Sequence, residues 1–111
     1  MREILDKERD LINYLLENLN PKHTVRTPER CRTMNDGAMG SISFDLSNSA
    51  KYGSDLVQVK YLDADNVPVY ITLTTDKEGN LFELDFWKVD FSKLIKYPEP
   101  GEITKTTTNN I

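Results

Sequence analysis

The stretch VPVYITLTTDKEGNLFELDFWKVDF, from Val67 to Phe91, predicts two antiparallel strands joined by a short turn. In its first half every second residue is apolar, as in a strand with one buried face. The residues on this face are Val67, Val69, Ile71 and Leu73. The segment DKEGN, 76–80, then supplies a loop with a glycine where a positive φ is needed. An antiparallel hairpin is therefore expected at the centre of the fold.

The second half of the same stretch threads carboxylates among large apolar residues. Up to Phe86 the apolar side chains share one face, and they are Phe82, Leu84 and Phe86. Glu83 and Asp85 fall on the opposite face, which we expect to meet water. Beyond this point the apolar residues have the other parity, and they are Trp87, Val89 and Phe91. A bulge near Phe86-Trp87 is predicted to reconcile the two halves.

Two further strand regions precede this hairpin. The segment LVQVKYL, 56–62, alternates with Val57, Val59 and Tyr61 on one face, and ADN at 64–66 turns the chain. Upstream, CRTMNDGAMGSISF contains Asp36-Gly37, a dipeptide that favours a tight hairpin turn. We predict strands over about 30–35 and 38–46 around it.

The N-terminal region predicts one helix, from about residue 6 to 19. Its apolar stripe follows the i, i+3, i+4, i+7 spacing and consists of Leu11, Ile12, Leu15, Leu16 and Leu19. Asp6 is a candidate N-cap, and Pro21 ends the helix. The predicted fold class is α+β: an N-terminal helix packed on an antiparallel sheet of about five strands. We expect one domain over 1–98 and a flexible C-terminal tail over 99–111.

The net charge and the N-terminal residues indicate what kind of partner the protein binds and where in the cell it is found. The chain has 111 residues, a net charge of -4 and one cysteine. This acidic balance disfavours nucleic acid and anionic membranes as partners and favours a basic protein. The charged N-terminus lacks the apolar core of a signal peptide, so a cytoplasmic location is expected.

Two sets of residues are candidates for catalysis. Cys31 and His23 could form a nucleophile–base pair, since such partners meet in space rather than in sequence. No third orienting group is identifiable for them, and Cys31 also fits as a small apolar strand residue. Glu83 and Asp85 lie two residues apart on one strand, with Cα atoms about 6.6 Å apart, as paired acids in glycoside hydrolysis can be. An alternating strand with its polar face outward explains the same pair without chemistry.

Neither a cofactor nor a metal is predicted. The glycine-bearing NDGAMGS lacks the G-K-[ST] ending of a phosphate-binding loop, and no helix follows it. Asp63, Asp65 and Asn66 resemble the start of a calcium loop, but glycine at the sixth position and glutamate at the twelfth are missing.

The motifs DGAMGS and DKEGNLFELDFWKVDF, with a leading ERDLINYLL helix, resemble a family of small bacterial proteins described as a domain of unknown function. The resemblance covers about Glu8 to Pro98. In type, the chain is also similar to immunity proteins, which neutralise toxins exchanged between competing bacteria. That likeness implies a small, acidic, α+β protein without catalytic residues, and it transfers no functional residue.

The combined expectation is a non-enzymatic binding protein, an immunity protein that covers the active site of a basic toxin such as a nuclease. Four residues are predicted to contact the partner, namely Glu83, Asp85, Trp87 and Asp90. Asp63 and Asp65 are predicted as charges on the rim. Two alternatives stay open: a small hydrolase that uses Glu83/Asp85 or Cys31/His23, and a domain that self-associates through an open sheet edge.

Overall fold

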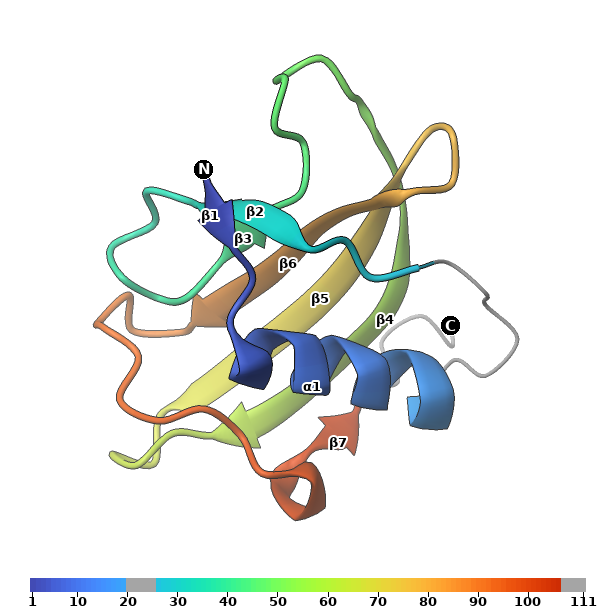
Figure 1. The fold of residues 1–111 in the computed structure, drawn as a ribbon. Coiled ribbons are helices and arrows are strands. Elements are labelled where there is room, and N and C mark those ends of the chain that lie inside the picture. The colour runs from blue at the N-terminus through green and yellow to red at the C-terminus, as the bar shows by residue number, and fades with distance from the viewer. Residues whose placement is uncertain (20–25, 107–111) are drawn as a thin grey trace.

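The computed structural model describes residues 1–19 and 26–106, in which one helix lies across one face of an antiparallel sheet (Figure 1). The strand order is β1-β2-β3-β6-β5-β4-β7. The strands are β1 (Arg2–Glu3), β2 (Arg30–Thr33), β3 (Ile42–Ser43), β4 (Tyr52–Leu62), β5 (Pro68–Asp76), β6 (Leu81–Lys88) and β7 (Thr104–Lys105). The predicted α+β class is confirmed, with seven strands in the described part of the chain instead of about five. The two edge strands, β1 and β7, are two residues long and carry no periodicity that a sequence could reveal.

The helix forms where the leucine spacing predicts it. Helix α1 (Asp6–Tyr14) continues into a π-helical turn (Leu15–Leu19). Four residues of the predicted stripe are buried, namely Leu11, Ile12, Leu15 and Leu16. Pro21 and the side chain of Leu19 lie outside the described residues.

The predicted N-cap, Asp6, is wrong, because the cap residue is Leu5. The Glu8 carboxylate accepts the Leu5 backbone N–H at 2.9 Å, so a side chain of the first turn satisfies the amide at the helix start. Arg2 of β1 donates two hydrogen bonds to the same carboxylate, at 2.9 and 2.8 Å. This pair therefore ties the helix start to the edge of the sheet.

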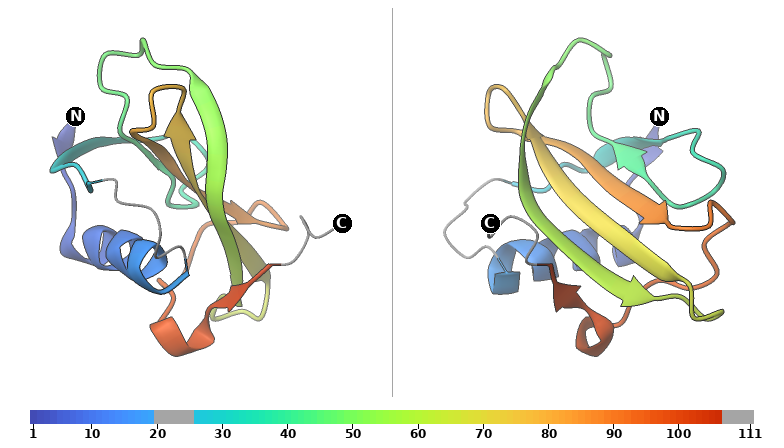
Figure 2. Two further views of the ribbon diagram at one scale, coloured as in Figure 1. Left: turned by 90° about the vertical axis from the view of Figure 1, so that its right-hand side faces the viewer. Right: turned by 180° about the vertical axis from the view of Figure 1, so that it is seen from behind.

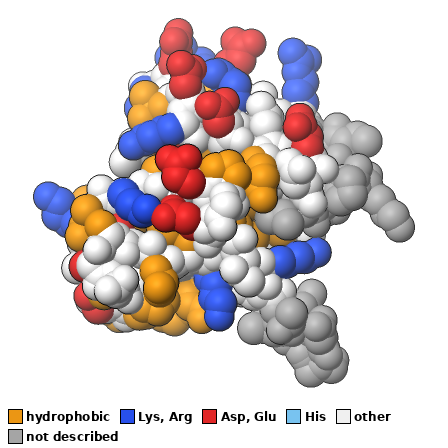
Figure 3. Space-filling view, turned by 90° about the horizontal axis from the view of Figure 1, so that it is seen from below, with side chains coloured by type: hydrophobic (Ala, Val, Ile, Leu, Met, Phe, Trp, Pro, Cys, Tyr) orange, Lys and Arg blue, Asp and Glu red, His pale blue; other side chains and the backbone are white. Residues whose placement is uncertain are grey.

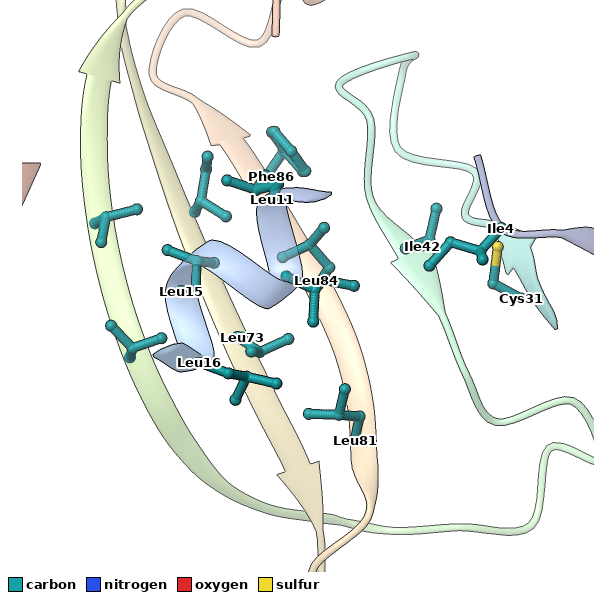
Figure 4. Packing of buried hydrophobic residues seen from close by; sticks show 14 of the residues in the cluster. Ile4, Leu11, Leu15, Leu16, Cys31, Ile42, Leu73, Leu81, Leu84 and Phe86 are labelled. Carbon is teal, nitrogen blue, oxygen red and sulfur yellow. The ribbon is translucent and has the colours of Figure 1, made fainter. Parts of the chain in front are cut away.

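The core lies between α1 and strands β4, β5 and β6. The alternation predicted for the strands is confirmed, since Val57, Val59, Tyr61, Val69, Ile71 and Leu73 are all buried. Figure 4 shows Leu11, Leu15 and Leu16 of the helix lying over labelled side chains of β5 and β6. Burial of this stripe, rather than intrinsic propensity, stabilises so short a helix.

The bulge predicted near Phe86-Trp87 is wrong. The register between β5 and β6 runs without a break from Leu73↔Leu84 to Val69↔Lys88. The irregularity lies at the other end of the strand, where Thr75 pairs with Leu81 and β6 accommodates one extra residue.

Thr74 holds this bulge in place. Its hydroxyl oxygen Oγ1 accepts the Glu83 N–H at 3.1 Å and donates to the Glu83 carbonyl at 3.3 Å. The extra residue shifts the parity, so that Leu81 instead of Phe82 joins the buried face.

The hairpin predicted around Asp36-Gly37 is present, with a longer loop. Strands β2 and β3 pair antiparallel, and residues 34–41 connect them. The Asp36 carboxylate accepts the N–H groups of Met39 and Ser41, each at 3.1 Å. Because the loop closes through this side chain rather than through a two-residue turn, the strands are shorter than the predicted 30–35 and 38–46.

The described part of the C-terminal segment joins the fold, in contrast to the flexible tail expected over 99–111. Residues Pro100–Glu102 form a 3₁₀ turn, and β7 pairs with β4 at Val59 and Lys60. Ile103 packs against the core. Residues 107–111 lie outside the described part. Within 1–19 and 26–106, no helix combines the length and apolarity needed to span a membrane.

Candidate functional site

The face of β4, β5 and β6 that points away from α1 carries no helix in the described part of the chain (Figure 2). We call this surface the outer face. Alternation with the buried residues assigns to it Gln58, Lys60 and Leu62 of β4, Tyr70 and Thr72 of β5, and Glu83, Asp85 and Trp87 of β6. The sequence predicted this side for Glu83 and Asp85, and the strand register places them there.

One end of the outer face is acidic. Asp85 and Glu83 are half-buried rather than freely solvated. Burial raises the pKa of Asp85, and the charges of Asp36 and Asp55 raise it further, while a hydrogen bond from Ser41 at 3.4 Å opposes them. Their environment therefore disfavours the ionised form of the outer-face acids.

Glu83 differs from Asp85 in having a cation nearby. Burial raises the pKa of Glu83 and so does the charge of Asp85, whereas Arg32 lowers it. The groups whose charge acts on Asp85 are acidic. Burial and neighbouring acids therefore raise the pKa of both carboxyl groups, and the group that opposes this is a cation at Glu83 and a hydroxyl at Asp85.

The other end of the outer face is aromatic. Trp87 is 45% exposed and stacks on Tyr70, its cross-strand neighbour, with ring centroids 5.6 Å apart and planes at 28°. Lys60 lies beyond Tyr70 on β4. Strand register puts Trp87 next to Asp85 on the same face, so π surface and carboxylate adjoin.

The prediction of Asp63 as a rim charge is wrong, because Asp63 is buried. It forms an ion pair with Lys88 at 2.9 Å, in which both side chains are inaccessible to solvent. The backbone N–H groups of Ala64, Ile95 and Lys96 donate to it at 2.7, 2.9 and 2.9 Å. Burial alone would raise the pKa of Asp63, but the hydrogen bonds from Lys88 and from the backbone lower it to about 2.

Lys88 is the residue that the sequence reasoning missed at this place. It continues the inward parity of Leu84 and Phe86, and its ammonium donates to Asp65 at 2.8 Å and to the Lys93 carbonyl at 3.0 Å. The alternation of β6 could have revealed it, because a lysine at an inward-facing position of a strand needs a buried acid as its partner. This cluster joins the end of β6, the β4–β5 turn and the segment 93–96. Asp65, still partly exposed, has a structural partner in it.

Asp90 holds a turn. Its carboxylate accepts the Ser92 backbone N–H at 3.0 Å and the Ser92 hydroxyl at 2.6 Å, and these bonds lower its pKa. The turn presents Phe91, which is 70% exposed and has a φ of +63°. Phe91 therefore does not continue the buried face, contrary to the parity expected after Phe86.

Glu83 and Asp85, one of the two sets of catalytic candidates, lie near each other on the outer face, and of the other set the structure describes only Cys31. Cys31 of β2 is buried, and burial raises the pKa of its thiol, which disfavours the thiolate nucleophile. His23 lies outside the described residues. Among the residues that the structure describes, no group of three His, Cys, Asp or Glu side chains is placed to hold a metal ion.

Hollows lie elsewhere on the molecule. One of about 280 Å³ is bordered by α1 and the segment 97–103, with Tyr14, Tyr97 and Ile103 in its wall. Two more, of about 510 and 430 Å³, share Arg26, Pro28, Phe44 and Leu46. Seen from below, hydrophobic side chains show in several patches, with acidic and basic groups among them (Figure 3).

Comparison with known proteins gives a family. The model of the family described as Domain of unknown function (DUF6984) matches residues 1–98, and the chain belongs to this family. No curated protein and no solved structure matches. The segment that forms β7 lies beyond the matched residues.

Proposed function

We propose that this member of the DUF6984 family is a non-enzymatic binding protein whose outer face docks on a basic protein. We further propose that the partner is a toxin, such as a nuclease, which this protein neutralises as immunity proteins do. The observation that carries the proposal is the outer face itself, where the half-buried Glu83 and Asp85 adjoin the exposed Trp87.

Electrostatics supports a cationic partner. An ionised carboxylate that is partly desolvated and flanked by other acids has a high free energy in the unbound protein. A basic group that lands beside Asp85 would relieve this repulsion, and it would do so in a region that the partner shields from water. Complementary charges of this kind also speed association and exclude acidic competitors.

Apolar exposure at the Trp87 end of the outer face supports a protein as the partner. Trp87 and Leu62 are 45% and 54% exposed, and Phe91 follows β6 by three residues. Tryptophan is enriched among the residues that dominate binding energy in protein interfaces. A bulky residue at positive φ is strained, and such strain persists where function requires it. The Asp90 turn therefore fits the presentation of Phe91 to a partner.

Net charge supports the toxin class. A nuclease groove is basic because it binds phosphate, and an acidic protein of charge -4 can occupy it through complementary charge.

The test begins with the neighbouring gene product and the native source cells. Tagged wild-type protein and an Asp85→Asn/Trp87→Leu double variant serve as baits, and captured proteins are quantified by mass spectrometry. We expect a basic protein that the wild type captures and the double variant loses. An Asp10→Asn variant, altered on the helix side, is the matched control and should capture as the wild type does.

Neutralisation is the second arm of this test. The captured protein, expressed alone, should be toxic, and co-expression of the wild type should restore growth while the double variant should not. A partner retained equally by the double variant would contradict docking on the outer face. A captured partner that is not toxic would contradict the immunity role but not the docking on the outer face.

A small hydrolase is the second candidate, and the raised pKa values of Glu83 and Asp85 favour it, because a general acid needs such a shift. Glu83→Gln and Asp85→Asn should each abolish turnover if this is the activity. A panel of glycoside substrates assayed with wild type and both variants separates the candidates, because a binding protein has no turnover to lose.

A further inference from the structure

We infer that the outer face recognises an arginine side chain of the partner, with the guanidinium stacked on the Trp87–Tyr70 pair and hydrogen-bonded to Asp85. This inference rests on the proposed function and specifies the partner group that the outer face receives. It predicts a preference for arginine over lysine, which charge complementarity alone does not.

The geometry of β6 provides the two halves of such a site. Asp85 and Trp87 are two residues apart, so their side chains leave the same face of the strand, with Cα atoms about 6.7 Å apart. A guanidinium is planar and carries five N–H donors in a rigid fork. One flat ion can thus cover the aromatic ring while its edge reaches the neighbouring carboxylate.

The aromatic half is prearranged. Tyr70 stacks against Trp87 at 5.6 Å, and this contact fixes the indole in the absence of a partner. Arginine on an indole face gains cation–π energy, and it is more weakly hydrated than an ammonium. A lysine would keep the charge attraction but lose the stacking and the fork.

The surrounding charges locate the cation on the Asp85 side. Asp36 and Asp55 act on Asp85 from the 34–41 loop and from β4, and Glu83 is the next acid along β6. Lys60 is the cation across the sheet, beyond Tyr70. A positive group therefore meets attraction beside Asp85 on β6 and repulsion beside Lys60 on β4.

The test is an NMR titration of the full chain with three short peptides. Each peptide has three identical test residues separated by glycine. The test residue is arginine in the first peptide, lysine in the second and citrulline, a neutral analogue of arginine, in the third. We expect the arginine peptide to shift backbone signals of Tyr70, Asp85 and Trp87. The lysine peptide should bind roughly 3- to 10-fold more weakly, as loss of about 0.7–1.4 kcal/mol of stacking implies. Citrulline should not bind measurably.

Variants assign the site. Asp85→Asn and Trp87→Leu should each weaken the arginine peptide several-fold, whereas Asp10→Asn should leave it unchanged. The dispersion of the NMR signals of each variant without peptide shows whether the variant is folded. If Trp87→Leu does not fold, Tyr70→Leu tests the same aromatic stack. Lys60→Gln should strengthen binding slightly.

The outcomes separate this inference from the proposed function. Equal affinity for the arginine and lysine peptides would overturn the specific recognition of arginine, but it would still be consistent with a basic partner. Shifts elsewhere than on the outer face, or none, would overturn the arginine site. The docking proposal is judged independently by whether the double variant loses the native partner.

Discussion

Phe91 has a conformation that folding alone does not explain. Its side chain is 70% exposed and its φ is +63°, a region that L-residues other than asparagine and aspartate rarely adopt. Glycine would meet no steric penalty there. The sequence predicted an inward Phe91 because parity was extended past Lys88, where the strand ends and the Asp90 turn begins.

Phe91→Gly should stabilise the free protein by about 1 kcal/mol, because the left-handed conformation costs an L-residue roughly that much. Urea unfolding measures the change. Ile95→Gly is the control, since Ile95 is also exposed but has no positive φ, and it should give no gain. An unchanged or lower stability of Phe91→Gly would show that the turn is not strained.

Asp63 contributes to stability with a defined pH dependence. Its pKa is about 2 in the fold against an ordinary 3.8, so the folded state favours the carboxylate. This contribution is fully present above about pH 4 and is lost as the pH falls toward 2.

Asp63→Asn should therefore lower the free energy of unfolding at pH 7 by about 2 kcal/mol. The difference from wild type should shrink between pH 4 and pH 2. Denaturant titrations at several pH values measure it. If the difference in free energy of unfolding between wild type and Asp63→Asn stayed constant down to pH 2, the ion pair with Lys88 would not favour ionisation of Asp63.

At the scale of elements, a helix or strand could be predicted from the sequence where its apolar residues recur with a regular spacing. The leucine stripe of α1 and the alternation in β4 and β5 extend over enough residues to specify a period, and both predictions were confirmed. The bulge at Thr74 was not predictable, because it depends on a hydroxyl of β5 that bonds the backbone of β6. The rim role of Asp63 failed for a similar reason: Lys88 reaches it from 25 positions along the chain (88 minus 63).

Leu15→Ala tests the packing of the helix on the sheet. Leu15 is a fully buried member of the stripe, and truncation of such a leucine costs about 2–5 kcal/mol. Thermal unfolding by circular dichroism measures the loss. The matched control is Leu62→Ala on the outer face, where the side chain is 54% exposed and we expect a change within about 0.5 kcal/mol. Equal effects at both positions would contradict a one-sided core.

At the scale of the whole molecule, helix α1 covers one face of the sheet, and the outer face stays open in the part of the chain that the structure describes. Parity in the sequence assigned Glu83 and Asp85 to the outer face, where the structure has them, and Trp87 was predicted only as a contact residue. The sequence could not show that Asp85 is half-buried, because Ser41 of the 34–41 loop, which is distant in sequence, contacts Asp85 and Phe86 there. The ionised carboxylate of Asp85 therefore has a higher free energy than a fully solvated one would have.

Asp85→Asn should raise the melting temperature of the free protein at pH 7. The pKa of Asp85 is raised in the fold, so its stabilising contribution is present at low pH and is lost as the pH rises through the folded-state pKa. Asparagine has no such loss. The gain should therefore vanish at pH 3, which scanning calorimetry at both pH values measures. A variant less stable than wild type at pH 7 would contradict a strained carboxylate.

Lysine reactivity tests the docking face most directly. Lys60 lies on the outer face and Lys7 on α1, and both are exposed. Acetylation of the free protein and of its complex with the native partner, read by mass spectrometry, compares them within one molecule. We expect the partner to protect Lys60 and to leave Lys7 reactive. Protection of Lys7 with Lys60 still reactive would place the partner on the helix side and contradict docking on the outer face.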